Sequence, residues 1–410
     1  MTPFGPAGRR LRVLVLTWNY PTPAAPQRGL WAQRMCDAAA QTADVTVIVP
    51  TPWVPPLVPV PALSRFRRVP ARDRRGAVDV HFPRVPGSIE YLTHDRDAGL
   101  ALSRVLAVAR RLHEAAPFDV IHAHFIYPDG VVASHIGREL GVPVMTSEHS
   151  YWTPWLTDKR RVGEQVARAL PGIRLVSAVS ESLRSSIEEF TRGSVETAVL
   201  PNVVDDHVFN PMSPLPRDPE ELLYVGLIRR VKRLDVLLRA LADVRRTMPG
   251  LHLRILSANA YRAYGKDRRD VERLIETLGL SDAVQIVRGT EPEGVADAMR
   301  RAAFVTVTSA RETFCSVAAE SLACGTPVVV TRCGGPEEFV SAADGVLVPA
   351  GDPIAYAAGL REAFARQSEF DSAAIASRIV ERFGRAAWTE RAMTLYERTA
   401  ASRPAPAARP

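Results

Sequence analysis

The chain has 410 residues, of which 46% are hydrophobic and 24% charged, with a formal net charge of +7 and four cysteines. This length is too great for one ordinary domain and predicts two domains with sizeable cores. No apolar run reaches the roughly 18 residues of a membrane span, and the cysteine spacing fits neither a zinc site nor a disulfide framework. We therefore expect a soluble cytoplasmic protein. The basic balance with few aromatic residues favours anionic substrates or an anionic membrane surface over nucleic acid.

The N-terminal segment predicts a β-α-β unit. A buried strand over Leu11–Leu16 is followed by a helix from Leu30 to Gln41 and a strand from Val45 to Val49. A dinucleotide-binding chain carries G-x-G-x-x-G after the first strand. Here the strand is followed by T-W-N-Y-P-T-P, and Gly29 is the one glycine before the helix. The sequence therefore argues against an NAD enzyme.

A proline-rich segment after this unit ends in a basic cluster. Residues 65–75 contain six arginines and one acidic residue, Asp73. Such a charge run is most often a solvated loop. The functional alternative is contact with an anionic membrane or with a lipid-linked phosphate, on the inner face of the membrane.

Polar residues follow the ends of two consecutive strands. The strand Phe118–His122 continues into H-A-H-F-I-Y-P-D-G, which contains His124, Tyr127 and Asp129. The next strand, Pro143–Thr146, is followed by S-E-H-S-Y-W, which contains His149. Open α/β sheets bind ligands at the carboxyl ends of their strands, so we expect both histidines at one edge of the sheet.

A proline-rich linker, residues 201–218, leads to a second set of strands and helices. The strand Glu221–Val225 is followed by a glycine turn, four basic residues (Arg229, Arg230, Lys232 and Arg233) and a helix from Leu234. A glycine turn with cations before a helix predicts a phosphate-binding loop.

The stretch from Ser309 to Phe339 predicts the centre of the site. A loop ending at Glu312 precedes a short helix from about Cys315 to Ala323, and a Gly334-Gly335-Pro336 turn opens a second one. Free N–H groups at a helix start favour an anion. Glu320 lies roughly 7–8 Å beyond that start at ~1.5 Å per residue, and Glu312 lies on its other side. A nucleotide sugar matches this arrangement, because its pyrophosphate lies between a sugar and a ribose whose hydroxyls could each meet one carboxylate.

Three motifs resemble those of the large retaining glycosyltransferase family called family 4, which has the GT-B fold. The run E-T-F-C-S-V-A-A-E-S-L-A-C-G-T-P-V-V resembles its signature, with Cys315 where the family commonly has Gly and Ser321 where it usually has Ala. The stretch H-A-H-F-I-Y-P-D-G resembles its acceptor-domain motif. The run P-N-V-V-D-D-H-V-F-N-P resembles its crossover motif, with Val203 in place of Gly.

The resemblance implies an α/β protein of GT-B fold, with two doubly wound Rossmann-like domains facing across a cleft. The N-terminal acceptor domain would span residues 1–205 and the nucleotide-sugar domain residues 217–380. The last helix, residues 385–400, would pack back on the N-terminal domain, and residues 401–410 would form a disordered tail.

It also implies retaining transfer from a nucleotide-diphosphate sugar to a hydroxyl acceptor, either soluble or lipid-linked, without a metal or other cofactor. The pathway would be cell-surface polysaccharide, glycolipid or secondary-metabolite biosynthesis. The family arginine position holds Leu227, so Arg229 or Arg230 would replace it. No general base is assigned. The implied catalytic residues are Glu312, His149 and Lys232; the donor-binding residues are Gly29, Arg229, Arg230, Lys232, Gly289, Phe314, Cys315, Ser316 and Glu320; and the acceptor-side residues are His124, Tyr127 and Asp129.

Two alternatives stay open at the level of sequence. A sugar-nucleotide epimerase of the same fold would share the donor residues and need no acceptor. A non-catalytic membrane- or polyanion-binding protein would use the basic cluster and bind in a salt-sensitive way that is indifferent to nucleotide.

Overall fold

The computed structural model describes residues 9–54, 64–85, 97–151, 160–212, 216–257, 265–289 and 291–401. The chain divides into two compact units: unit 1 comprises residues 1–203 and 388–410, and unit 2 comprises residues 204–387. The expected C-terminal tail falls almost entirely outside the described residues. Within the part described, no helix combines the length and the apolar character that a membrane span requires.

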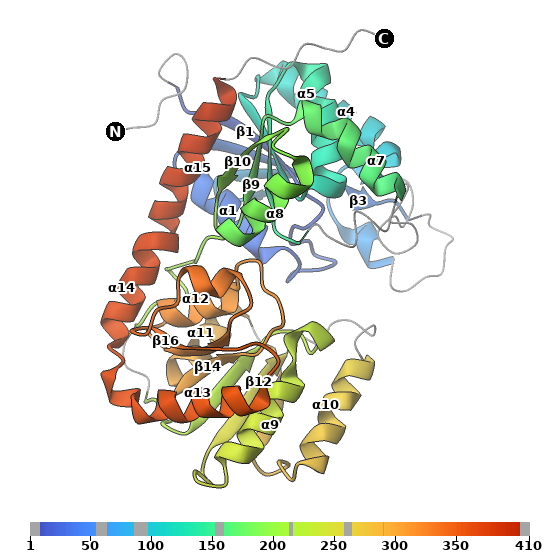
Figure 1. The fold of residues 1–410 in the computed structure, drawn as a ribbon. Coiled ribbons are helices and arrows are strands. Elements are labelled where there is room, and N and C mark those ends of the chain that lie inside the picture. Colours follow the sequence, from blue (N-terminus) through green and yellow to red (C-terminus); the bar gives the residue numbers. More distant parts are fainter. Residues whose placement is uncertain are drawn as a thin grey trace. The chain divides into compact units, whose positions relative to one another are not determined.

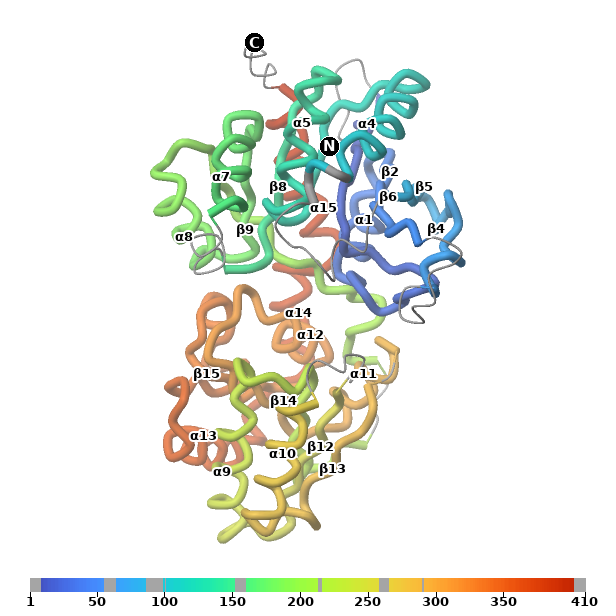
Figure 2. Tube along the Cα trace, turned by 90° about the vertical axis from the view of Figure 1, so that its right-hand side faces the viewer, coloured from blue at the N-terminus to red at the C-terminus, as the bar shows by residue number. Residues whose placement is uncertain are grey.

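Unit 1 is built on an eight-stranded sheet in the order β10-β9-β8-β7-β1-β2-β5-β4. Its strands pair in parallel except for β4, which runs antiparallel to β5. Figure 2 shows β4 beside β5 at one edge of unit 1. A separate two-stranded sheet joins β3 to β6. The strands are β1 (Arg12–Leu16), β2 (Asp44–Ile48), β3 (Thr51–Pro52), β4 (Arg72–Arg75), β5 (Val78–His81), β6 (Arg84–Val85), β7 (Val120–His124), β8 (Val144–Glu148), β9 (Leu175–Ala178) and β10 (Glu196–Val199).

Helices cover both faces of this sheet. Figure 1 shows α4, α5 and α7 together on one side, with α1 and α15 on the other. The last helix is tied to unit 1 by Trp388, whose indole Nε1–H donates to the carbonyl of Pro201 at 2.8 Å, and by Thr389, whose hydroxyl donates to Ala38 O at 3.1 Å. The helices are α1 (Leu30–Ala39), α4 (Asp97–Ala115), α5 (Val131–Leu140), α7 (Arg160–Ala169), α8 (Glu181–Thr191) and α15 (Arg385–Ala400).

Unit 2 contains a six-stranded, wholly parallel sheet in the order β13-β12-β11-β14-β15-β16. Strands β14, β15 and β16 are nearly continuous apolar runs, as expected for parallel strands that are covered on both faces, whereas the edge strand β13 carries polar residues. The strands are β11 (Glu221–Val225), β12 (His252–Ser257), β13 (Val284–Arg288), β14 (Phe304–Val307), β15 (Val328–Thr331) and β16 (Gly345–Val348).

The helices of unit 2 also lie on both faces of their sheet. In Figure 1, α9 and α13 lie on one face, and α11 and α12 lie on the other. The core of the first face is formed by the apolar sides of α9 and α13, where Leu237, Leu241 and Leu360 are fully buried. The helices are α9 (Leu234–Val244), α10 (Gly265–Thr277), α11 (Pro292–Arg301), α12 (Ser316–Ala323), α13 (Pro353–Ala365) and α14 (Ser372–Phe383).

The basic segment of residues 65–75 is more ordered than the solvated loop that the sequence favours. Its first part is a short 3-10 helix, η1 (Arg65–Arg68), and its second part is strand β4. The turn after β4 contains Gly76 at φ 56°, which allows β4 to fold back onto β5. The polar and charged composition of β4 suits an edge strand, because charged side chains there discourage pairing with other chains.

Candidate functional site

In unit 2, the loop after β11, which the sequence predicts to bind phosphate, is joined to the loop after β14 by an ion pair. Lys232, in the 3-10 turn η4 (Arg230–Lys232), places Nζ 2.6 Å from Oε1 of Glu312. The hydroxyl of Ser309 donates to the same oxygen at 2.6 Å. Burial alone would lower the pKa of Lys232, but the adjacent Glu312 carboxylate outweighs it and raises the pKa. The lysine is therefore held charged.

The loop of Glu312 is fixed by backbone pairing with the glycine turn. The N–H of Glu312 donates to Cys333 O at 2.7 Å, and the N–H of Gly335 donates to Glu312 O at 2.9 Å. A Cβ at Gly335 would lie 2.5 Å from the carbonyl oxygen of Thr313. Glycine is required here because the two loops approach so closely.

Helix α12 starts next to this ion pair. Its N-cap is Cys315, which has φ 72° and ψ 67°, the left-handed conformation that glycine adopts without strain. Burial raises the pKa of its thiol, so the group is neutral. Phe314 packs on Phe339 and Phe383, with ring centroids 5.4 and 5.2 Å away, and anchors the start of the helix. The first-turn N–H groups of α12 lack partners within the helix, and such groups favour an anion.

The other expected donor residues differ in placement. Glu320 is half-buried on α12, one and a half turns from its start. Arg229 and Arg230 are exposed at the beginning of η4. Gly289 follows β13, and its N–H donates to Ser257 O at 3.0 Å. The carbonyl of Leu227 accepts a hydrogen bond from the hydroxyl of Tyr224 at 2.9 Å. This bond stabilises the turn after β11.

In unit 1, the two strand-end histidines lie together. Nδ1 of His124, at the end of β7, is 3.1 Å from Nε2 of His149, which follows β8. Nδ1 of His149 is 3.1 Å from Oδ1 of Asn202 in the crossover motif. Trp31 of α1 packs against both rings, with centroid distances of 4.1 Å to His149 and 5.2 Å to His124.

These histidines are neutral. Burial lowers the pKa of His149 to about 3, and burial also lowers the pKa of His124 well below its usual value. Nearby His122 lies inside β7, where burial lowers its pKa to about 3. Its ring nitrogens lie 2.9 Å from the Tyr396 hydroxyl and 2.7 Å from the Ser147 hydroxyl, which connects α15 to the strand-end cluster.

The other two residues predicted on the acceptor side, Tyr127 and Asp129, lie in the loop after β7. Both are buried in the irregular turn η2 (Ile126–Gly130). Oδ1 of Asp129 accepts the N–H of Trp18 at 3.0 Å and so fixes the loop after β1. The buried carboxylate of Glu148 accepts the N–H groups of Ile126 at 3.0 Å and of His149 at 2.9 Å.

Gly29 closes the same loop. It has φ 71° at the N-cap of α1, and a Cβ there would lie 2.2 Å from the carbonyl oxygen of Asn19. The neighbouring Arg28 donates through Nε and Nη2 to Oδ1 of Asn19, each at 3.2 Å. Gly29 is therefore needed for loop packing, whatever its part in donor binding.

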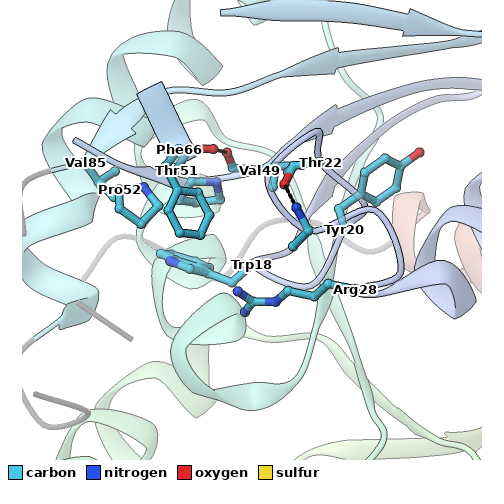
Figure 3. Close-up of a pocket in the computed structure, with 11 residues that line it drawn as sticks. Trp18, Tyr20, Thr22, Arg28, Val49, Thr51, Pro52, Phe66 and Val85 are labelled. Atoms are coloured by element: carbon cyan, nitrogen blue, oxygen red, sulfur yellow. Dashed lines mark hydrogen bonds between the residues drawn. The ribbon is translucent and has the colours of Figure 1, made fainter. Parts of the chain in front are cut away.

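A pocket lies beyond the ends of β1 and β2 in unit 1 (Figure 3). Figure 3 shows the indole of Trp18 and the guanidinium of Arg28 close together on one side of it and the ring of Phe66 on another. The lining residues are Trp18, Tyr20, Thr22, Ala25, Arg28, Val49, Pro50, Thr51, Pro52, Phe66 and Val85.

The sequence analysis missed Trp18, Trp31 and Asn202. Trp18 stands in T-W-N-Y, directly after the first strand, and Asn202 stands in P-N-V-V, at the start of the crossover, whereas nothing around Trp31 signals a site. No sequence spacing relates Trp31 and Asn202 to His149, because they meet it only in the folded unit.

One cluster in unit 2 has the residue types of a metal site. Asp218, Glu221 and His252 offer ligand atoms within 4.8 Å of one another, among the residues that the structure describes. These residues lie at or just before the amino ends of β11 and β12, whereas Lys232 follows the carboxyl end of β11. Arg254 pairs with Glu221 at 2.7 Å, so the cluster is accounted for as an ion-pair network.

Two protein-family models match adjoining parts of the chain. The model described as Glycosyltransferase Family 4 matches residues 32–208, and the model described as Glycosyl transferases group 1 matches residues 209–378. Together they cover residues 32–378, with a junction in the crossover segment.

Known proteins and solved structures agree with these matches. The D-inositol 3-phosphate glycosyltransferase of Nocardiopsis dassonvillei is 32% identical over 282 residues, 63% of this chain and 65% of that protein. The Thermobispora bispora protein of the same name is 30% identical over 362 residues, 81% of this chain and 83% of that protein. The chain thus spans just under two thirds of the first relative. HepE from Anabaena, solved in complex with UDP-glucose, superposes with a TM-score of 0.68 at 17% identity, covering 94% of this chain and 99% of HepE.

Proposed function

Since this chain belongs to the glycosyl transferases group 1 family, also called family 4, we propose that it transfers a sugar from a nucleoside-diphosphate sugar to a hydroxyl of a phosphorylated polyol. Transfer would retain the anomeric configuration of the sugar. The donor class is supported by the complex of HepE with UDP-glucose. The acceptor class is supported by the names of the two relatives, which are inositol-phosphate glycosyltransferases.

The observation that carries the proposal is the Lys232–Glu312 pair at the start of α12. A leaving pyrophosphate gains negative charge as the glycosidic bond breaks. A charged lysine and a helix N-terminus stabilise that charge without rearranging, which is electrostatic catalysis of the leaving group. Glu312 would bind hydroxyls of the donor sugar, and Glu320 would bind the ribose. This chemistry requires no metal.

The acceptor would bind to unit 1. Arg28 presents a guanidinium at the pocket of Figure 3, and a guanidinium suits a phosphate because its N–H groups form a planar fork. A lipid-linked phosphate offers the same anion. His124, Tyr127 and Asp129 would contribute indirectly, because they fix the loops after β1 and β7.

The direct test is incubation of the protein with UDP- and GDP-sugars, with and without inositol phosphates. We expect release of nucleoside diphosphate that depends on the acceptor, and a product whose anomeric configuration matches that of the donor. Conversion of the donor sugar without any acceptor would indicate an epimerase instead.

The matched variants are Lys232→Ala and Lys266→Ala. Lys266 is an exposed lysine on α10 of the same unit. We expect Lys232→Ala to lower kcat more than it raises the donor KM, because the lysine interacts most strongly with the charge of the transition state. Lys266→Ala should have little effect. Equal kinetics in the two variants would remove Lys232 from the mechanism.

A further inference from the structure

An exposed tryptophan lies in the segment that contacts the start of the basic cluster. Trp53, directly after β3, is 53% exposed, although large aromatic side chains are normally buried. The arginines of η1 (Arg65, Arg67 and Arg68) are all exposed. Nε of Arg67 donates to the carbonyl of Val54, the residue after Trp53, at 3.4 Å, so η1 lies against the end of β3. We call these four residues the η1 patch.

Arg84 of β6 fixes the backbone of the η1 patch. Nη1 of Arg84, in β6, donates to Phe66 O at 2.7 Å, and its Nη2 donates to Val69 O. Phe66 itself is buried in the core of unit 1 and lines the pocket of Figure 3. The backbone of η1 is thus fixed to the fold while its arginine side chains face solvent. The sequence from Thr51 to Arg72 contains no acidic residue.

The three arginines of β4 are different. Arg72 pairs with Asp79 at 3.0 Å, and Arg75 pairs with Asp73 at 3.1 Å. Arg75 also lies over the ring of buried Tyr20, 5.4 Å from its centroid. These contacts tie Arg72 and Arg75 to the edge of the sheet.

We propose that the η1 patch binds the surface of an anionic lipid membrane. Arginine side chains close to such a surface are attracted by its negative potential. Tryptophan is the residue that prefers the membrane–water interface, because its ring is apolar and its N–H stays hydrated. One aromatic residue beside a compact basic turn fits a lipid surface better than nucleic acid, which is bound by several stacking aromatics along a groove. This inference is independent of the reaction that the protein catalyses.

The test is co-sedimentation of the full chain with vesicles of phosphatidylcholine, with or without phosphatidylglycerol. The patch variant is Arg65→Ser/Arg67→Ser/Arg68→Ser. The control variant is Arg160→Ser/Arg161→Ser/Arg168→Ser, which removes the same charge from α7, where all three arginines are exposed. Each arginine near the surface contributes about a factor of five, so the patch variant should bind anionic vesicles about 100-fold more weakly. The control variant should lose much less, and salt should weaken the parent protein.

A second readout reports on Trp53 directly. With brominated lipid in the anionic vesicles, tryptophan fluorescence of the parent protein should be quenched, and Trp53→Phe should bind with most of this quenching lost. Absence of vesicle binding by the parent protein at low salt would overturn the proposal. Equal losses in the patch and control variants would also overturn it, and so would tighter binding to duplex DNA than to vesicles. Thermal unfolding of each variant separates these outcomes from misfolding.

Discussion

Lys232 and Glu312 form an ion pair within unit 2, with Nζ and Oε1 2.6 Å apart. The cation assigned to the pyrophosphate is thus partly neutralised by the carboxylate assigned to the sugar. The side chains are 29% and 14% exposed, so solvent screens the pair only in part. When the donor binds, Lys232 would interact with both the Glu312 carboxylate and the phosphates.

Glu312→Gln should therefore separate binding from turnover. Glutamine keeps the shape and a hydrogen bond to Lys232 but removes the negative charge. We expect the affinity for nucleoside diphosphate to stay the same or rise, while kcat falls by at least tenfold and the free energy of unfolding falls by about 1–2 kcal/mol. Calorimetry with UDP and GDP and initial-rate kinetics provide the measurements. A large loss of nucleotide affinity would mean that Glu312 is needed to hold Lys232 in place.

Glu320→Ala should weaken binding of the nucleoside diphosphate. Loss of charge-assisted hydrogen bonds to the ribose costs on the order of 1.5–3 kcal/mol, about 10- to 150-fold in affinity. Binding of inorganic pyrophosphate, which has no ribose, should be unchanged and serves as the control. If both ligands lose affinity equally, Glu320 does not bind the ribose.

Cys315 provides a test of backbone strain at the start of α12. Its φ of 72° suits glycine, but its side chain is buried. Cys315→Gly should relieve about 1 kcal/mol of strain and lose a similar amount of apolar burial, so stability should change by less than about 1 kcal/mol. Cys315→Val should unfold more easily by about 2 kcal/mol or more, because β-branched residues avoid this conformation. Urea titrations measure both effects, and equal stability of the two variants would show that the conformation costs little.

The α/β fold and the family were predicted correctly from the sequence, because strand, glycine turn and helix signals recur with regular spacing. The GT-B fold is confirmed by the two parallel-sheet units and by the similarity to solved structures. The conformation of Cys315 fits the glycine that the family has there. Such local features are readable because they depend on neighbouring residues.

Features that join distant segments could not be predicted. The pairing of Lys232 with Glu312 depends on the adjacency of β11 and β14, and nothing in the sequence signals it, because the two residues are 80 positions apart. Strand β4 was read as a loop because its sequence is charged at every position and carries no alternation of apolar residues. The roles assigned to individual site residues remain predictions.

Asn202 should control the protonation of His149. Its amide oxygen faces Nδ1 of His149, so this nitrogen carries the proton and Nε2 accepts from His124. Asn202→Asp would place a carboxylate there and raise the pKa of His149, so the pH–rate profile should gain a step near neutral pH. Asn210→Asp, in the same crossover but bonded to the carbonyls of Asp206 and His207, is the matched control and should not add this step. Identical profiles for the two variants would exclude the coupling.

The buried histidines should make stability depend on pH in a defined window. His122 and His149 have pKa values lowered to about 3 by burial, and burial also lowers the pKa of His124, whereas histidine in an unfolded chain titrates near 6.5. Above pH ~6.5 the histidines are neutral in both the folded and the unfolded protein, so their full contribution to the free energy of unfolding is present. As the pH falls from 6.5 towards 3, only the unfolded state takes up protons, so stability is lost. The slope is about 1.4 kcal/mol per pH unit for each histidine.

Urea unfolding between pH 5 and 8 checks this, because carboxylates contribute little in that range. We expect a plateau above pH 7 and a steep loss below pH 6.5, to which the three histidines contribute up to about 4 kcal/mol per unit. His149→Gln keeps hydrogen-bonding groups without titrating, so it should reduce the slope below pH 6.5 by about 1.4 kcal/mol per unit and leave the plateau flat. An unchanged slope would mean that His149 takes up its proton in the folded protein as readily as in the unfolded chain.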